Sequence, residues 1–484
     1  MRRSLLWLIL LLSMLCLLCA CKEEHTCDFG AWTVEEPATC GAWGRKAQCC
    51  ACGQRQESAI PPTERHPLLL KNGNCSACGV ALQATEGLQY AINEDGRSVR
   101  ITGVEGDAHK AVILPAYYEQ LPVTTVGSKA FEGHGEMESV TLPETLTTLE
   151  SASFVFCTGL TEIQLPAGLT AIGGSAFGFC SGLKEITVPD GVTEIGETAF
   201  AGCSSLTRVQ LPQGLIALRS GAFNLCTSLV EINLPDSLCI MEGSLFTGSK
   251  LTRVRIPEGV AGLGPYAFRL CGELREVTLP STLTQIGHHA FADCEGLASV
   301  TFPSGVTTIG EYAFFNTGLT EVRIPANVTG IGFAAFSSCS ALERIAVATE
   351  NVRYRSIGDC LVDWESKTLI LGCKNSVIPE GGAVLRIGEA SFRNCVGLTS
   401  IAIPAAVTHI EESAFCGCER LTHVSLAEES KLKAIEIYAF SLCNLLLWSG
   451  DAGIWQVDTE EGVVGMTLNA VTMEAHSHCR WYRE

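Results

Sequence analysis

The sequence predicts a mainly β repeat solenoid, a curved stack of short coils of chain. The first observation is a phenylalanine that recurs at a fixed period, because the nine intervals between its first ten copies are all 22 or 23 residues. The second is that the copies share one pattern, AF-x-x-C-x-x-L-x-x-I-x-L-P-x-x-L-T-x-I-G-x-x-AF. A fixed period of this length indicates stacked repeats. The recurring residues are Phe131, Phe154, Phe177, Phe200, Phe223, Phe246, Phe268, Phe291, Phe314, Phe336, Phe392, Phe415 and Phe440.

Each coil of about 23 residues contains two short apolar segments. In one coil, Ile163 and Leu165 are two residues apart and therefore share one face of a strand, which Pro166 ends because proline has no N–H for a ladder. The second segment ends at Ile172, and Gly173 turns the chain. One coil cannot bury its own apolar side, so neighbouring coils must stack at the strand spacing of about 4.8 Å.

The repeat pattern resembles the BspA-like leucine-rich repeats of bacterial surface proteins, including the treponemal type, over roughly residues 90–447. The resemblance implies a curved solenoid with a parallel sheet on its concave side. It also implies a role in adhesion or recognition.

The chain has 25 cysteines, and ten of them stand three residues after a repeat phenylalanine. A metal array or a chain of disulfides is one interpretation. We expect instead buried, reduced thiols that donate weakly to a turn carbonyl. Asn316 is taken to replace the cysteine in one coil, which fits a hydrogen-bonding ladder. The ladder cysteines are Cys157, Cys180, Cys203, Cys226, Cys271, Cys294, Cys339, Cys395, Cys418 and Cys443.

A Cys-rich module, residues 22–85, precedes the solenoid and contains two C-x-x-C-G turns. Their four cysteines, Cys49, Cys52, Cys75 and Cys78, have the layout of a zinc ribbon, in which glycine lets both thiolates of a turn meet one ion. The layout also resembles small modules that accompany these repeats in gut bacteria. We expect a structural zinc, with disulfides as the alternative. Other residues that could serve as ligands are His25, Cys40 and His66.

Residues 1–21 read as a signal peptide, with a charged start followed by an apolar stretch. The stretch ends at Cys21 in a segment that resembles a lipobox, which implies that Cys21 is acylated and becomes the mature N-terminus. We therefore expect an exported protein that faces the cell exterior and touches a membrane only through its lipid anchor. Ordinary secretion is the alternative.

The solenoid is expected at residues 86–447, with an insertion at about 349–379 and a C-terminal cap or tail at 448–484. Within the insertion, two strands flank Ser366-Lys367, which we expect to form a two-residue turn. That register places Cys360 opposite Cys373 in a non-hydrogen-bonded pair, with Cα atoms about 4.5 Å apart. A disulfide accepts this distance, so we expect one, with an unbridged pair as the alternative.

The net charge of −19 disfavours nucleic acid as a partner. The sequence contains no H-E-x-x-H, G-x-S-x-G, P-loop or G-x-G-x-x-G motif, and we expect no enzyme. Three hypotheses remain open: a surface protein for adhesion or recognition, a scaffold of the cell envelope, and an enzyme or inhibitor built on the solenoid. We favour the first, with a protein or glycan ligand on host or neighbouring cells.

The expected binding surface is the set of outward strand positions on the concave sheet. No aromatic residue appears in those columns, so arginine is the residue there that protein interfaces favour. The predicted ligand-binding residues are Arg253, Arg255, Glu276, Glu321 and Arg323.

Overall fold

The computed structural model describes residues 83–106, 109–443, 447–449, 454–459, 462–467 and 478–483, together with the backbone of four N-terminal strands. The chain divides into two compact units, residues 1–66 with 77–79 and residues 67–76 with 80–484. The described part of the first unit is an antiparallel sheet in the order β1-β2-β3. Its strands are β1 (Thr33–Glu36), β2 (Gly44–Cys49) and β3 (Arg55–Ile60).

The second unit is a mainly β solenoid in which most coils contribute two short parallel strands, one to each of two ladders. The first ladder is a continuous sheet of thirteen described strands, which we call the inner sheet. It begins with β5 (Leu88–Ile92), β6 (Val99–Val104), β8 (Tyr117–Tyr118) and β9 (Leu121–Val126). It continues through β11 (Thr148–Leu149), β12 (Ala171–Ile172), β14 (Glu194–Ile195), β16 (Ala217–Leu218), β18 (Ile240–Met241), β20 (Gly262–Leu263), β22 (Gln285–Ile286), β23 (Thr308–Ile309) and β25 (Gly330–Ile331).

The second ladder, which we call the outer ladder, is broken into short sheets. Its residues alternate as the sequence predicts, because Ile186 is buried between the exposed Glu185 and Thr187. The strands are β10 (Ser139–Pro143), which pairs with β4 (Leu68–Leu69) and β7 (Ala111–Ile113), then β13 (Glu185–Thr187), β15 (Arg208–Gln210), β17 (Glu231–Ile232), β19 (Arg253–Arg255), β21 (Glu276–Thr278), β24 (Glu321–Ile324) and β26 (Arg344–Val347).

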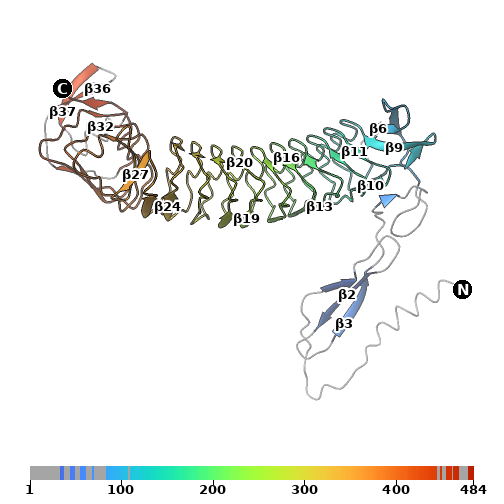
Figure 1. The fold of residues 1–484 in the computed structure, drawn as a ribbon. Helices are drawn as coiled ribbons and strands as arrows, with labels where there is room; N and C mark the ends of the chain where they lie inside the picture. The colour runs from blue at the N-terminus through green and yellow to red at the C-terminus, as the bar shows by residue number, and fades with distance from the viewer. Residues whose placement is uncertain are drawn as a thin grey trace, which may run out of the picture. The chain divides into compact units, whose positions relative to one another are not determined.

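The solenoid bends toward the inner sheet. Figure 1 shows β11, β16 and β20 on the concave side of the bend, with β13, β19 and β24 on the convex side. Coils that converge on the concave side keep all neighbouring strands within hydrogen-bonding distance, whereas coils that spread on the convex side keep only some of them, as in β13-β15-β17 and β19-β21. The bend therefore agrees with a continuous inner sheet and a broken outer ladder. The expected parallel sheet on the concave side is confirmed.

The core is built around a column of stacked phenylalanine rings. From Phe131 to Phe336, successive ring centroids lie 5.2–5.9 Å apart, one ring per coil. A second column, Phe392, Phe415 and Phe440, has spacings of 4.8 Å. The insertion lies between the two columns. The ring of Phe392, which starts the second column, packs over the backbone of Gly372 in the insertion, where a Cβ would lie 1.9 Å from the ring.

The predicted burial of the ladder cysteines holds for nine of the ten, and Cys443 is half-buried. All ten ladder cysteines are free thiols. Nine donate through Sγ to a phenylalanine carbonyl of a preceding coil at 3.0–3.2 Å; Cys203, for example, donates to Phe177. The placement of Asn316 in this ladder is wrong, because Thr317 holds the cysteine position and contacts the Sγ of Cys339 at 3.1 Å. Asn316 instead has a left-handed backbone, with φ of 53°.

The insertion forms an antiparallel arrangement of β27 (Tyr354–Ile357), β28 (Cys360–Asp363) and β29 (Thr368–Leu371). The predicted register is wrong, because Asp363 pairs with Thr368 and leaves four residues in the turn. The physical reason is the Asp363 carboxylate, which accepts the N–H groups of Glu365 at 3.1 Å and Ser366 at 3.3 Å.

The predicted disulfide of the insertion is absent, because Cys360 and Cys373 are both free and buried. Cys360 pairs with Ile357 of β27 instead. Cys373 lies beyond β29, and its Sγ contacts the carbonyl oxygen of Glu343 at 3.3 Å. The bulge between Leu361 and Val362 adds a further shift to the register.

Beyond the insertion the two ladders resume and end in a cap. The inner strands are β30 (Arg386–Ile387), β32 (His409–Ile410) and β34 (Ala434–Ile435), and the outer ones are β31 (Ser400–Ile403), β33 (His423–Leu426) and β35 (Leu447–Ser449). The hairpin β36 (Ile454–Thr459) and β37 (Gly462–Thr467) joins this sheet through β38 (Trp481–Tyr482). Trp455 and Trp481 are buried and cover the last coil's core.

Candidate recognition surfaces

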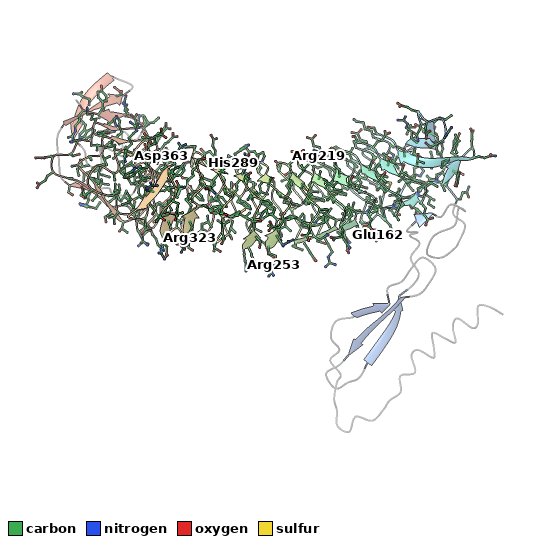
Figure 2. The ribbon with its side chains drawn as sticks, in the orientation of Figure 1. Glu162, Arg219, Arg253, His289, Arg323 and Asp363 are labelled. Carbon is green, nitrogen blue, oxygen red and sulfur yellow. The ribbon has the colours of Figure 1, made fainter. Side chains whose placement is uncertain are left out.

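The five residues predicted to form the concave binding surface lie on the outer ladder. Arg253 and Arg255 are on β19 beside Glu276 of β21, whereas Glu321 and Arg323 are on β24, in a separate sheet. Figure 2 places Arg253 and Arg323 on the convex side of the bend. The concave location predicted for these residues is therefore wrong. Most coils have two strands, and the one that carries the clearer alternation, such as Glu185–Thr187, faces outward.

The charges of this convex surface are largely paired with one another. Arg255 lies 2.8 Å from Asp236, and Arg323 lies 2.9 Å from Glu321. Arg344 also approaches Glu321, at 3.9 Å. These arginine side chains are exposed, and such surface pairs contribute little to stability. The surface has the character of a solvated charged face.

The inner sheet presents hydroxyl groups and a few ion pairs. Thr147 and Thr170 donate their hydroxyls to the carbonyls of the preceding coil, each at 3.2 Å. Arg219 bridges Glu194 at 2.7 Å and Glu242 at 2.9 Å, and these carboxylates raise its pKa. The polar groups of this sheet are thus mostly engaged within the solenoid.

A column of aromatic rings runs along the turns that follow the inner strands. We call it the aromatic column, and its members are Tyr266, His288, His289, Tyr312 and Phe333. The ring of His289 stacks on Tyr266 at 4.9 Å and on Tyr312 at 4.8 Å. Tyr312 meets Phe333 edge-on at 5.2 Å. All five side chains are partly or fully exposed, and Figure 2 places His289 on the side of the bend that carries Arg219.

The backbone fixes where these rings point. Tyr266, His289 and Tyr312 each stand two residues before a phenylalanine of the core column, in a left-handed conformation with φ of 58°, 54° and 53°. The same position in other coils also has positive φ, and it holds smaller or polar residues: Lys129, Ala152, Ser175, Thr198, Gly221, Ser244, Ala334, Ala390 and Ser413. Tyr438 is a further aromatic at this position, in the last coil.

The electrostatics of the aromatic column favour a neutral imidazole at its centre. Burial lowers the pKa of His289, and the neighbouring His288 and Arg269 add to this effect. The guanidinium of Arg269 lies 5.7 Å from the ring centre of Tyr266 and 3.7 Å from the carboxylate of Asp293. The column and the adjacent Arg269 therefore bring together two tyrosines and an arginine, residue types that are enriched among interface hot spots.

The zinc and lipid sites stay predictions. Cys49 is the last residue of β2 and pairs with Arg55. Cys52, Cys75, Cys78 and Cys21 lie outside the described residues. Across the part of the chain that the structure describes, no group of three or more His, Cys, Asp or Glu is placed to hold a metal ion. The described residues also contain no helix long and apolar enough to cross a membrane.

The fold defines a β solenoid of leucine-rich coils, and comparison with known proteins agrees with this class. The model of the BspA type leucine rich repeat region matches residues 124–252, 193–303, 261–361 and 371–448. These matches cover more than half of the chain, and the protein belongs to this family.

Solved structures of bacterial leucine-rich repeat proteins are similar. The Treponema pallidum leucine rich repeat protein is 31% identical over 44% of this chain and 90% of its own, with a TM-score of 0.37. A leucine rich cell surface protein from Faecalibacterium prausnitzii is 23% identical over 77% and 94%, with a TM-score of 0.41. A leucine-rich repeat protein from Eubacterium ventriosum is 19% identical over 79% and 98%, with a TM-score of 0.42. No match was found among curated proteins.

Proposed function

We propose that this protein is an exported, non-enzymatic recognition protein that binds a partner protein on a host or neighbouring cell. The aromatic column is the observation that carries this proposal. Export and a lipid anchor at Cys21 are supported by the sequence of residues 1–21. The BspA type repeats, which resemble those of bacterial surface proteins, also support a location at the cell surface.

The aromatic column suits a binding role because its rings are accessible, four of them partly exposed and that of His288 exposed, and because they are already ordered. Tyrosine and histidine have few rotatable bonds, so little conformational entropy is lost when a partner covers them. Stacking between coils restricts Tyr266, His289 and Tyr312 further. The column lies beside the concave sheet, where a partner seated in the bend would contact several coils at once.

The column is a better candidate than the convex arginines. Arg255 and Arg323 would have to exchange existing ion pairs for new ones, with no clear gain. The rings of the column, in contrast, would gain by leaving water, at about 25 cal/mol per Å² of apolar surface.

The test compares two triple variants of the mature chain. The first is Tyr266→Ser, His289→Ser and Tyr312→Ser, which the fold tolerates because Ser175, Ser244 and Ser413 hold the same left-handed position, with φ of 54–55°. The matched control replaces three convex arginines, Arg253, Arg255 and Arg323, by serine. The immobilised wild-type chain first captures a partner from bacterial or host surface extracts, and the partner is then purified.

Surface plasmon resonance then gives the dissociation constant of each variant. Loss of a hot spot costs at least about 2 kcal/mol, so the aromatic triple should bind at least about 30-fold more weakly. The arginine triple should stay near the wild type. Unchanged affinity in the aromatic triple, or loss of affinity confined to the arginine triple, would contradict the proposal.

A further inference from the structure

A cavity of about 230 Å³ opens where the insertion interrupts the inner sheet, and we call it the seam pocket. On one side the continuous inner sheet ends at β25. On the other side the next sheet runs through β28, β29 and β30. The lining residues used below are Ile331, Phe333, Leu361, Ile370, Glu389 and Glu411, which come from both sides of the seam.

Hydrogen bonds between turns join the two sides of the seam next to the pocket. The N–H of Ser338 donates to the carbonyl of Arg393 at 3.1 Å, and the hydroxyl of Ser337 donates to the carbonyl of Ala390 at 3.1 Å. Asn394 adds a bond to the Ser338 hydroxyl at 2.9 Å. The coils on either side of the insertion are thus joined at their turns, while β25 has no partner on the seam side among the strands that the structure describes.

The wall of the pocket is apolar and its rim is acidic. Leu361 is buried, and Ile331, Phe333 and Ile370 are partly exposed toward the cavity. On the rim, Arg386 neutralises the carboxylate of Glu411 at 2.5 Å. The exposed carboxylate of Glu389 has no hydrogen-bond or ion-pair partner among the described residues. The rim therefore carries one carboxylate, that of Glu389, without a direct ion-pair partner among the described residues.

The pocket continues the aromatic column. Phe333 belongs to both, and it meets Tyr312 edge-on at 5.2 Å. Tyr312 is also near enough to Glu389 and Arg393 for their charges to act on its pKa, although burial, which raises that pKa, is the larger influence. A partner that covers the column as far as Phe333 would therefore also reach a residue that lines the pocket.

We propose that the seam pocket receives a basic side chain, lysine or arginine, from the protein partner; this inference rests on the proposed function. A cavity of this size is below the range of about 300–1,000 Å³ typical of small-molecule sites, so a single side chain fits it better than a cofactor does. The methylene stem packs against Ile331 and Ile370, as long basic side chains pack against apolar surface elsewhere. The cationic end meets the Glu389 carboxylate, with the ring of Phe333 alongside.

The first test uses small probes, so it does not depend on finding the partner. Isoleucine methyl groups of the full mature chain are labelled, and their NMR signals are followed during titration with Nα-acetyl-lysine methylamide, the arginine analogue, or the neutral norleucine analogue. The Ile331 and Ile370 methyls should shift with a saturable dependence on both basic probes. The norleucine analogue should bind at least ten times more weakly.

Two variants with the same change of net charge complete the probe test. Glu389→Gln should reduce binding of the basic probes to the norleucine level, whereas Glu276→Gln, on the convex ladder, should leave it unchanged. The inference is overturned if the basic probes leave the Ile331 and Ile370 methyls unmoved, or if Glu389→Gln binds them as the wild type does.

The second test uses the purified partner. Glu389→Gln should weaken its binding about tenfold, and unchanged affinity would overturn the assignment of the pocket to the partner's side chain. Failure of the proposed function would show differently, as unchanged affinity in the aromatic triple variant.

Discussion

Replacing a central ring of the phenylalanine column should destabilise the solenoid far more than replacing an exposed phenylalanine beside it. Phe200 is 0% exposed, and its ring lies 5.3 Å from those of both Phe177 and Phe223. Truncating a buried phenylalanine to alanine costs about 3–5 kcal/mol. We expect Phe200→Ala in the upper half of that range, because two stacked pairs, each contributing about 0.5–1.5 kcal/mol, are lost together.

Phe179 provides the matched control, since it lies in the preceding coil and is 46% exposed. It stacks on the equally exposed Phe156 at 4.9 Å. We expect Phe179→Ala to cost about 1 kcal/mol or less, as for one exposed aromatic pair.

The assay is urea unfolding of the full chain combined with hydrogen exchange. Each coil of a solenoid contacts only its neighbours, so the loss of protection in Phe200→Ala should be largest in the coils around residues 177–226 and decline away from them. Equal destabilisation by the two substitutions, or a loss of protection spread evenly along the chain, would refute the reasoning.

Four further predictions concern cysteines and pH. Burial raises the pKa of the Cys203 thiol to about 12. Iodoacetamide at pH 8 should therefore modify the exposed Cys239 in the native protein, and Cys203 only after unfolding. Fast modification of Cys203 in the native protein would count against the buried ladder. The mature chain should contain about one zinc by elemental analysis and Cys75→Ser should lose it, whereas a metal-replete protein without zinc would exclude the site. Cys21→Ser should move the protein from the membrane fraction to the medium, and retention in the membrane would exclude the anchor. Folding lowers the pKa of His289, mainly by burial, so the unfolded chain binds the imidazole proton more readily. The free energy of unfolding should therefore fall as the pH drops below about 6.5. His289→Ser should flatten this part of the stability profile, and an unchanged slope would contradict the lowered pKa.

The architecture was predictable from sequence because the repeat period is a local signal copied many times. The spacing of the phenylalanines fixed the coil length, and the cysteine three residues later fell on the buried side, as the bond from Cys203 to Phe177 shows. Which of the two strands of a coil lies on the concave side of the bend was not predictable in the same way. Curvature depends on how all the coils spread or converge, and most coils contain two strands that could face the concave side.

The predicted register of the insertion is wrong for a local reason. The two-residue turn at Ser366-Lys367 is the common solution for a hairpin. The Asp363 carboxylate, however, accepts two backbone N–H groups within the turn and also lies 3.1 Å from Arg353. Those side-chain bonds favour the longer turn, and the pairing of Cys360 with Cys373 is lost with the shift.

The aromatic column does not follow from the strand pattern, because its residues lie in the turns and not in the strands. A signal was present, since Tyr266, His289 and Tyr312 each stand directly before an AF pair. That these positions are left-handed and aligned from coil to coil follows from the fold. The seam pocket has no such signal, because Ile331 and Glu389 meet only through the packing of the two solenoid segments.

The most direct test of the central claim is a hydrogen-exchange footprint of the mature chain bound to its purified partner. The account predicts slowed exchange in the turns at residues 264–270, 287–293, 310–316 and 332–338, which carry the aromatic column, and no change in the convex strands β19, β21 and β24. Protection confined to those convex strands, with the turns of the aromatic column exchanging as in the free protein, would contradict it.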